Sequence, residues 1–124
     1  MRGFEEPRAE LVIKTGEYTC YASPERNKTA DEFMKLLNPL TVTVAVDGGA
    51  VVSGSFPFEL PGTCTTKEFN TGDIVYCGGN ILFLFENTKL CGTKIAHFYE
   101  GRAKEFYEAV KRDPLLELSL EWSE

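Results

Sequence analysis

The sequence has no long apolar run. Nowhere in its 124 residues is there a stretch approaching the roughly 20 apolar residues that a membrane-spanning helix needs. The N-terminal residues MRGFEEP are acidic and polar, and they lack the apolar segment of a secretory signal peptide. We therefore expect neither a membrane anchor nor a leader, and we expect a cytoplasmic protein.

Positive charge is also scarce. Thirteen lysines and arginines stand against nineteen aspartates and glutamates, which gives a net charge of −6. Binding to nucleic acid depends largely on a basic footprint, and binding to an anionic membrane surface depends on the same kind of patch. We therefore expect neither nucleic acid nor a membrane as a partner.

Metal-binding patterns are missing as well. The four cysteines (Cys20, Cys64, Cys77 and Cys91) are 44, 13 and 14 positions apart, whereas structural zinc sites favour pairs separated by a few residues. We expect no metal and no cofactor. In a reducing compartment the cysteines should be free thiols, mostly packed in the core. His97, the one histidine, could form a nucleophilic pair with Cys91, but a hydrogen-bonded structural imidazole is favoured.

The composition that remains is that of a folded domain. Hydrophobic residues make up 43% of the chain and aromatic residues 12%, which is too rich for disorder. No repeat, low-complexity tract or linker divides the sequence. We expect a flexible lead-in over residues 1–8 and a single domain over residues 9–124.

A β-hairpin is predicted at the centre of the fold. Its strands, Ile74–Cys77 and Ile81–Phe85, are β-branched or aromatic and flank a turn at Gly78-Gly79-Asn80. Every residue from Ile81 to Phe85 is apolar, so we expect both faces of this strand to be covered.

Two short helices are predicted from apolar residues spaced at i, i+3, i+4 and i+7. The first begins at Thr29, which has capping-box spacing to Glu32, and ends before Pro39. Its buried stripe should be Ala30, Phe33, Met34 and Leu37, and that of the second helix, over residues 101–112, should be Ala103, Phe106, Tyr107 and Val110.

Further strands are predicted from alternating apolar residues. In the strand over residues 116–122, Leu116, Leu118, Leu120 and Trp122 should point inward. Residues 63–70 and 87–93 read as polar connections. Seven or eight strands with two helices favour a mainly β fold, a small closed or nearly closed eight-stranded barrel capped by its helices. The other predicted strands cover residues 11–13, 18–21, 40–46, 51–52, 56–60 and 94–98.

Several short motifs in this order resemble small prokaryotic proteins of cyclophilin-like fold, a family known more from structure than from function. The resemblance implies an eight-stranded barrel with helices at its ends. The motifs are T-A-x-x-F-x-x-L-L running into P-L-T-V-T-V (29–44), P-F-E-L-P (57–61), G-D-I-V-Y (72–76), I-L-F-L-F (81–85) and T-K-I-A-H (93–97).

The resemblance also implies a test for activity. True cyclophilins are peptidyl-prolyl isomerases, in which an arginine donates to the prolyl nitrogen as amide resonance is broken. Here no arginine lies between Asn27 and Gly101, because the five arginines are Arg2, Arg8, Arg26, Arg102 and Arg112. We therefore expect no catalytic residue.

The favoured function is a non-catalytic binding module for a small apolar ligand or a peptide. A divergent prolyl isomerase is the alternative, and an accessory domain that acts through homo-oligomerisation is a third. The candidate ligand-binding residues, which would line an apolar groove, are Phe56, Phe58, Tyr76, Phe83, Phe98 and His97. Asp73 and Glu86 flank the hairpin as a carboxylate pair, although a turn role is favoured for Asp73.

Overall fold

Nine strands and two helices make up the residues described by the computed structural model, which are 10–15, 18–37, 40–47, 50–53, 65–99, 102–110 and 116–123. The helices are α1 (Lys28–Lys35) and α2 (Arg102–Val110). The strands are β1 (Glu10–Thr15), β2 (Tyr18–Pro24), β3 (Leu40–Asp47), β4 (Ala50–Ser53), β5 (Thr65–Phe69), β6 (Asp73–Cys77), β7 (Asn80–Leu84), β8 (Thr88–Phe98) and β9 (Leu116–Ser123).

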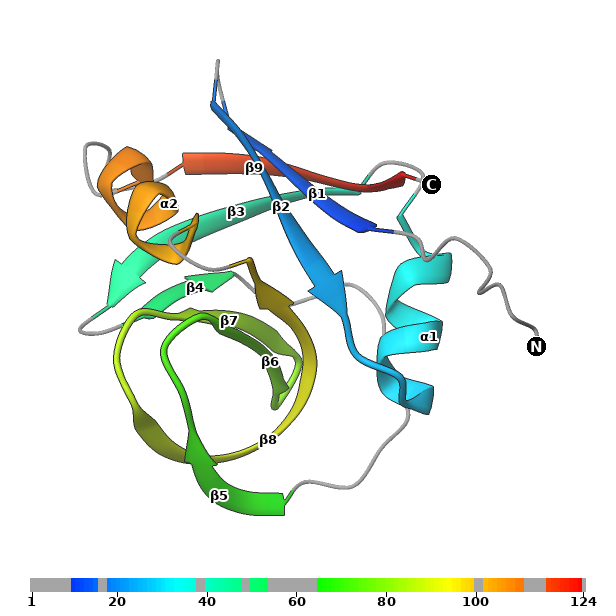
Figure 1. The fold of residues 1–124 in the computed structure, drawn as a ribbon, viewed down its shortest axis with the longest axis vertical. Helices are drawn as coiled ribbons and strands as arrows, with labels where there is room; N and C mark the ends of the chain where they lie inside the picture. The colour runs from blue at the N-terminus through cyan, green and yellow to red at the C-terminus, as the bar shows by residue number, and fades with distance from the viewer. Residues whose placement is uncertain are drawn as a thin grey trace, which may run out of the picture.

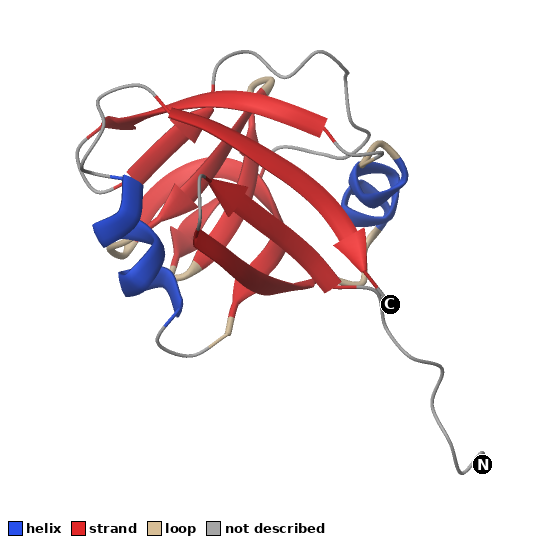
Figure 2. Ribbon diagram, turned by 90° about the horizontal axis from the view of Figure 1, so that it is seen from above, coloured by secondary structure: helices blue, strands red, loops and turns tan. Residues whose placement is uncertain are grey.

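The strands form one antiparallel sheet in the order β2-β1-β9-β3-β4-β7-β6-β8-β5. The sheet curls into a half-barrel, with α1 and α2 on opposite sides of it (Figures 1 and 2). Its flanks meet where β2 also pairs with β8, through Ala22–Phe98, Ser23–His97 and Pro24–Ala96. We call this junction the seam. The predicted mainly β fold with two short helices is confirmed, and the curled sheet has nine strands where eight were expected, because β5 pairs with β8 beside the other eight.

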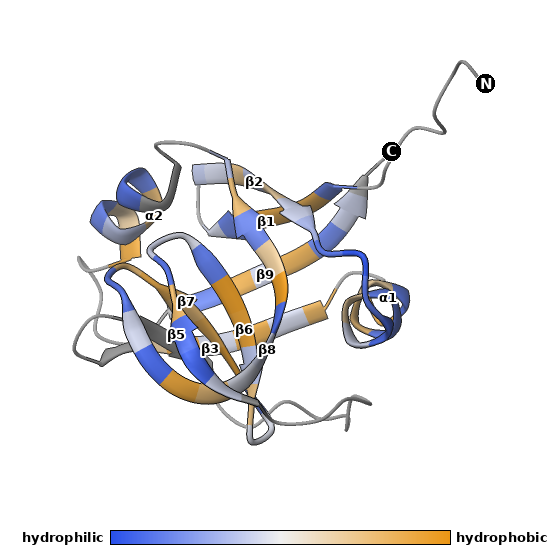
Figure 3. Ribbon diagram, turned by 60° about the horizontal axis from the view of Figure 1, so that its bottom comes forward, coloured by the Kyte–Doolittle hydropathy of each residue, from blue (hydrophilic) through white to orange (hydrophobic). Residues whose placement is uncertain are grey.

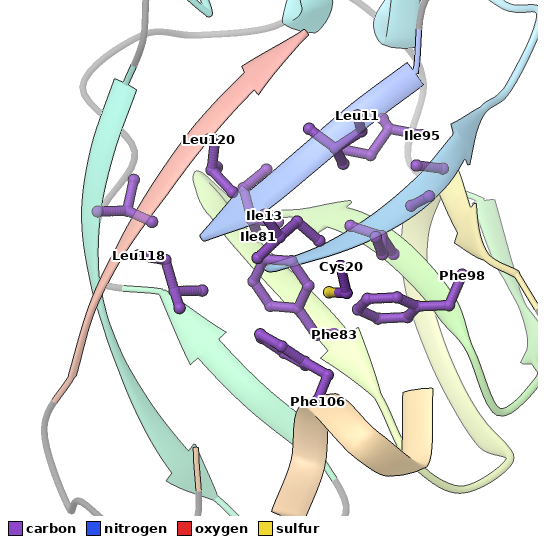
Figure 4. Close-up of a cluster of buried hydrophobic side chains, with 14 of the residues drawn as sticks. Leu11, Ile13, Cys20, Ile81, Phe83, Ile95, Phe98, Phe106, Leu118 and Leu120 are labelled. Carbon is purple, nitrogen blue, oxygen red and sulfur yellow. The ribbon is translucent and has the colours of Figure 1, made fainter. Parts of the chain in front are cut away.

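One face of the sheet encloses the main core. Alternate residues of β1, β3 and β9 point inward as their period-2 pattern predicts, for example Leu11, Val44 and Leu118. Phe106 of α2 covers the core at one side, with its ring centroid 5.3 Å from that of Phe83 and 5.2 Å from that of Phe98. Figure 4 shows the Cys20 sulfur among these three rings.

The hairpin of β6 and β7 is apolar on both faces, and both faces are covered. Gly78 and Gly79 form its two-residue turn with φ of 57° and 88°, values that glycine adopts without steric cost. Ile81 and Phe83 lie in the main core, whereas Leu84 lies in a second core on the opposite face. The prediction of two-sided burial is therefore confirmed.

The second core is small and is built around Phe69, Val75 and Leu84. β5 and the first half of β8 contribute to it, and both are strands where the sequence predicts polar connections. That prediction is wrong because the side chains of residues 66–68 are exposed and hide the pattern, while Phe69 is buried and anchors the described end of β5. Figure 3 shows β5 as hydrophilic beside the hydrophobic β6 and β7.

Gly92 lets β8 approach β6 closely. A Cβ atom added there would lie 2.6 Å from Cγ1 of Val75 and 3.0 Å from the Tyr76 carbonyl oxygen. A side chain would therefore force apart the strands that enclose the second core. This close approach explains why a glycine stands in the middle of a long strand.

Helix α1 begins earlier than predicted. Its N-cap is Asn27 and not Thr29, since the Asn27 side-chain oxygen accepts a hydrogen bond of 2.7 Å from the backbone N–H of Ala30. Asparagine is among the most favourable N-cap residues, whereas Thr29 is buried. The predicted stripe is confirmed, because Ala30, Phe33 and Leu37 are buried in the main core and Met34 packs against it.

The predictions for the last strand and for the second helix have different outcomes. Trp122 was expected to be buried, but it is 47% exposed near the end of β9. In the second helix the prediction holds for Phe106 and Val110, which are buried. The predicted strand over residues 56–60 lies outside the described residues, as do Pro39 and the lead-in.

The second core can be tested by truncating one residue from each face of β7. Leu84→Ala should lower the free energy of unfolding by about 2–5 kcal/mol and Phe83→Ala by about 3–5 kcal/mol, because each removes a fully buried side chain. Urea denaturation measures both. Glu68→Ala, at an exposed position of β5, is the control and should change stability by no more than about 0.5 kcal/mol. If Leu84→Ala lowers the free energy of unfolding by less than about 1 kcal/mol while Phe83→Ala has its full effect, the outer face of β7 is not a core.

Candidate functional site

An irregularity in β8 places two polar residues on the same face of the sheet. Ile74 pairs with Ala96, but the next residue of β6, Val75, pairs with Lys94, so that the register skips Ile95. Ile95 and Ala96 are both buried in the main core. Lys94 and His97, on either side of this bulge, therefore both point outward. Bulges commonly redirect side chains in this way beside functional sites.

Asp73 lies between these two residues and binds both. Its Oδ1 is 3.0 Å from Nδ1 of His97 and 3.2 Å from Nζ of Lys94. Its Oδ2 accepts a hydrogen bond of 2.9 Å from the backbone N–H of Asn70, which confirms the predicted turn role. The Asp73 side chain is only 5% exposed, so its carboxylate is held by three donors in a nearly dry position.

This arrangement fixes the hydrogen on the His97 ring. Because Asp73 presents an acceptor oxygen, Nδ1 of the neutral ring donates, which leaves the lone pair on Nε2. The His97 side chain is 45% exposed, although Asp73 beneath it is buried. In its neutral form the imidazole thus presents a fixed hydrogen-bond acceptor at the surface.

The backbone around the bulge is satisfied from across the seam. The carbonyl of Ile95 accepts a 2.8 Å hydrogen bond from the N–H of Glu25, and the carbonyl of Lys94 accepts a 2.9 Å hydrogen bond from Nδ2 of Asn27. Asn27 is also the N-cap of α1, so one side chain ties the helix to the bulge. Among the described residues, no buried side-chain nitrogen or oxygen lacks a hydrogen-bond partner.

Two tyrosines lie on the same outer face. Since Ala22 and Phe98 are paired and buried, their neighbours along each strand point outward. Tyr21 is 43% exposed and Tyr99 is 42% exposed, and the Tyr99 hydroxyl donates a 3.0 Å hydrogen bond to Oε1 of Glu10. We call this surface the seam face; its residues are Glu10, Tyr21, Ser23, His97 and Tyr99.

The residues predicted to bind a ligand have several locations. Phe83 and Phe98 are buried in the main core, where they pack against each other and against Phe106. Tyr76 is half-buried and also packs against that core. His97 alone is on the seam face. The remaining two, Phe56 and Phe58, lie outside the described residues.

Cys91 does not form the nucleophilic pair with His97 that its place in the sequence suggested. Cys20 and Cys77 are free, and the Cys77 thiol donates a 2.8 Å hydrogen bond to the Cys91 carbonyl. Cys91 itself is disulfide-bonded, which corrects the expectation that it is a free thiol. Spacing in the sequence does not reveal such a bond. No group of metal-ligating side chains occurs in the part of the chain that the structure describes.

The sequence singles out Asp73 and His97 separately and contains no sign that the two side chains meet. They are 24 residues apart, and only the pairing of β6 with β8 places them opposite each other. A signal for each residue was present, since each belongs to one of the short motifs, G-D-I-V-Y and T-K-I-A-H, quoted above. Tyr21, Ser23 and Glu10 carried no such signal.

Comparisons with known proteins concern the fold. A family model described as the cyclophilin-like family matches residues 13–120. The solution structure of a hypothetical protein from Archaeoglobus fulgidus is similar with a TM-score of 0.66 and 13% sequence identity, covering 96% of this chain and 98% of that one. Among curated proteins, none matches this sequence. Neither helix of the described residues has the length and hydropathy to cross a bilayer.

The role of Asp73 can be tested on the single histidine. In the neutral ring, long-range ¹H–¹⁵N correlation spectra should show the hydrogen on Nδ1, and Asp73→Asn should shift the ring towards the Nε2–H form, because an amide no longer demands a donor. Asp73→Ala should also cost about 1–3 kcal/mol of unfolding free energy, since buried donors lose their acceptor. An Nε2–H ring in the unmodified protein would contradict this geometry.

Proposed function

Because the chain belongs to the cyclophilin-like family, we propose that it is a binding module that takes an extended peptide on its seam face. The observation that carries the proposal is the pairing of a surface imidazole, held by the buried Asp73, with two exposed tyrosines on the same face. Burying a carboxylate is costly unless it is fully hydrogen-bonded, as Asp73 is. Its position is explained if the orientation of His97 matters for recognition.

Exposed tyrosines support a binding role for the same surface. Tyrosine combines a large apolar ring with a polar hydroxyl and loses little conformational entropy on binding, so it is enriched at recognition surfaces. Tyr21 precedes Ala22 and Tyr99 follows Phe98, so the two tyrosines lie on the same side of this buried antiparallel pair. Their rings therefore flank the seam at one end, and His97 lies further along it.

The seam face also favours a peptide over a compact small ligand. Its polar and aromatic groups follow two neighbouring strands, β2 and β8, and are not gathered around one point. An extended chain alternates its side chains and can contact such a row with every second residue. Prolyl isomerisation ranks lower: of the arginines in the described ranges, Arg26 lies between β2 and α1 and Arg102 is the first residue of α2, so neither belongs to a strand.

A second candidate function follows from Ser23. Ser23 of β2 pairs with His97 of β8, and Asp73 of β6 pairs with His97 from the other side. A hydroxyl, an imidazole and a carboxylate therefore lie in a row across three neighbouring strands. Such a row can activate a serine for attack on a carbonyl carbon. We rank it second because the described contacts include no hydrogen bond between the Ser23 hydroxyl and His97. Labelling of Ser23 by a fluorophosphonate, abolished by His97→Gln, would favour it.

The binding proposal can be tested by selecting peptides from a random library against the immobilised protein. Enriched peptides should bind the double variant Tyr21→Ala/Tyr99→Ala roughly tenfold or more weakly, because aromatic anchors contribute a large share of binding energy. Fluorescence anisotropy of the labelled peptides measures the affinity.

Trp122→Ala is the matched control. Trp122 is an equally exposed aromatic residue, but it pairs with the inward-pointing Leu11 and so does not share a face with Tyr21. It should leave the affinity unchanged. If the selected peptides bind the double variant as well as the unmodified protein, or if none is enriched, the proposal is wrong.

A further inference from the structure

The charge and hydrogen-bonding pattern of the seam face indicates which peptides it takes. We infer that it recognises an arginine side chain within an extended peptide, with the guanidinium beside Glu10 and against the tyrosine rings. This inference rests on the function proposed above and specifies its ligand. The chain as a whole carries a net charge of −6, which favours a cationic partner at long range.

Acceptors and aromatic faces dominate what the seam face presents. Glu10 contributes a carboxylate, of which Oε1 is already positioned by the Tyr99 hydroxyl at 3.0 Å. In the neutral ring His97 contributes the lone pair of Nε2, because its Nδ1–H donates to Asp73. A ligand that matches these groups must supply donors, and a guanidinium has five in a planar fork.

The lysines nearest the seam face are already paired. Nζ of Lys94 is 3.2 Å from Asp73 and 3.7 Å from Glu25. Nζ of Lys14 is 2.8 Å from Oε1 of Glu121, and this hydrogen bond raises the pKa of Lys14. Both ammonium groups thus have carboxylate partners of their own. None of the described ion pairs joins either lysine to Glu10.

The tyrosines add an attraction that is specific to cations. The face of a tyrosine ring attracts a guanidinium placed within about 6 Å of its centroid, and arginine uses this contact more often than lysine does. Tyr21 and Tyr99 are each exposed by more than two fifths, so a large part of each residue's surface reaches solvent. Tyr99 also holds Glu10, which sets a carboxylate and a ring at the same place.

The test compares two peptides of nearly the same shape, one with the guanidinium of arginine and one with the neutral urea of citrulline. Acetyl-Gly-Arg-Gly-amide and its citrulline counterpart are titrated into the ¹⁵N-labelled protein, and the amide shifts of Tyr21, His97 and Tyr99 are followed. The arginine peptide should bind about tenfold more tightly, from one exposed charge pair and one cation–π contact. Raising the salt from about 25 mM to about 300 mM should reduce the preference, since exposed charges are screened.

Glu10→Gln is the diagnostic variant. It keeps an oxygen for the Tyr99 hydroxyl but removes the charge, and it should lower the preference for arginine about threefold. Glu117→Gln, at an exposed position on β9, is the matched control and should change nothing.

Equal binding of the two peptides, or a preference that survives Glu10→Gln unchanged, would overturn this inference. The broader proposal then stands if citrulline or library peptides still shift the seam-face amides. The broader proposal of peptide binding is itself wrong if no peptide shifts the seam-face amides.

Discussion

The consecutive burial of Ile95 and Ala96 is the constraint on which the candidate site depends. A regular strand alternates its faces, so one of these two residues would otherwise point outward. The bulge lets both enter the main core, and Lys94 and His97 are then both directed outward, beside Asp73. The carbonyl groups displaced from the ladder are bound by Glu25 and Asn27 from beyond the seam. The same local irregularity thus serves packing, the junction between β2 and β8, and the orientation of the imidazole.

Two-sided burial of the central hairpin has a comparable influence on the rest of the sheet. Since β7 is apolar on both faces, some part of the chain must cover the side turned away from the main core. β5 and the start of β8 do so, with Phe69 as the principal side chain and Gly92 allowing a close approach. This requirement explains why a polar stretch is folded as a strand. Its single buried aromatic residue supplies the apolar contact, and its exposed residues face water.

These two features also separate what the sequence predicts from what it does not. The apolar run Ile81–Phe85, the glycine turn and the stripe of α1 are local patterns, and each predicts its structure correctly. The β5 strand is missed because three of its five residues are exposed and polar. The pairing of Asp73 with His97 is missed because it depends on the register between two distant strands, which no local pattern contains. Asn27 is missed as a cap because Thr29 offers a similar signal two residues later.

A face built from paired strands recognises ligands differently from a pocket. Its side chains are held rigidly by the sheet, and Asp73 and Glu10 fix the positions of His97 and Tyr99 further. Such a surface cannot surround a ligand, so each contact contributes little and affinity depends on making several at once. A compact molecule reaches one or two of these groups. An extended segment that followed the seam would reach Tyr21, Tyr99 and His97 together, which is why the proposed ligand is a peptide and not a compact molecule.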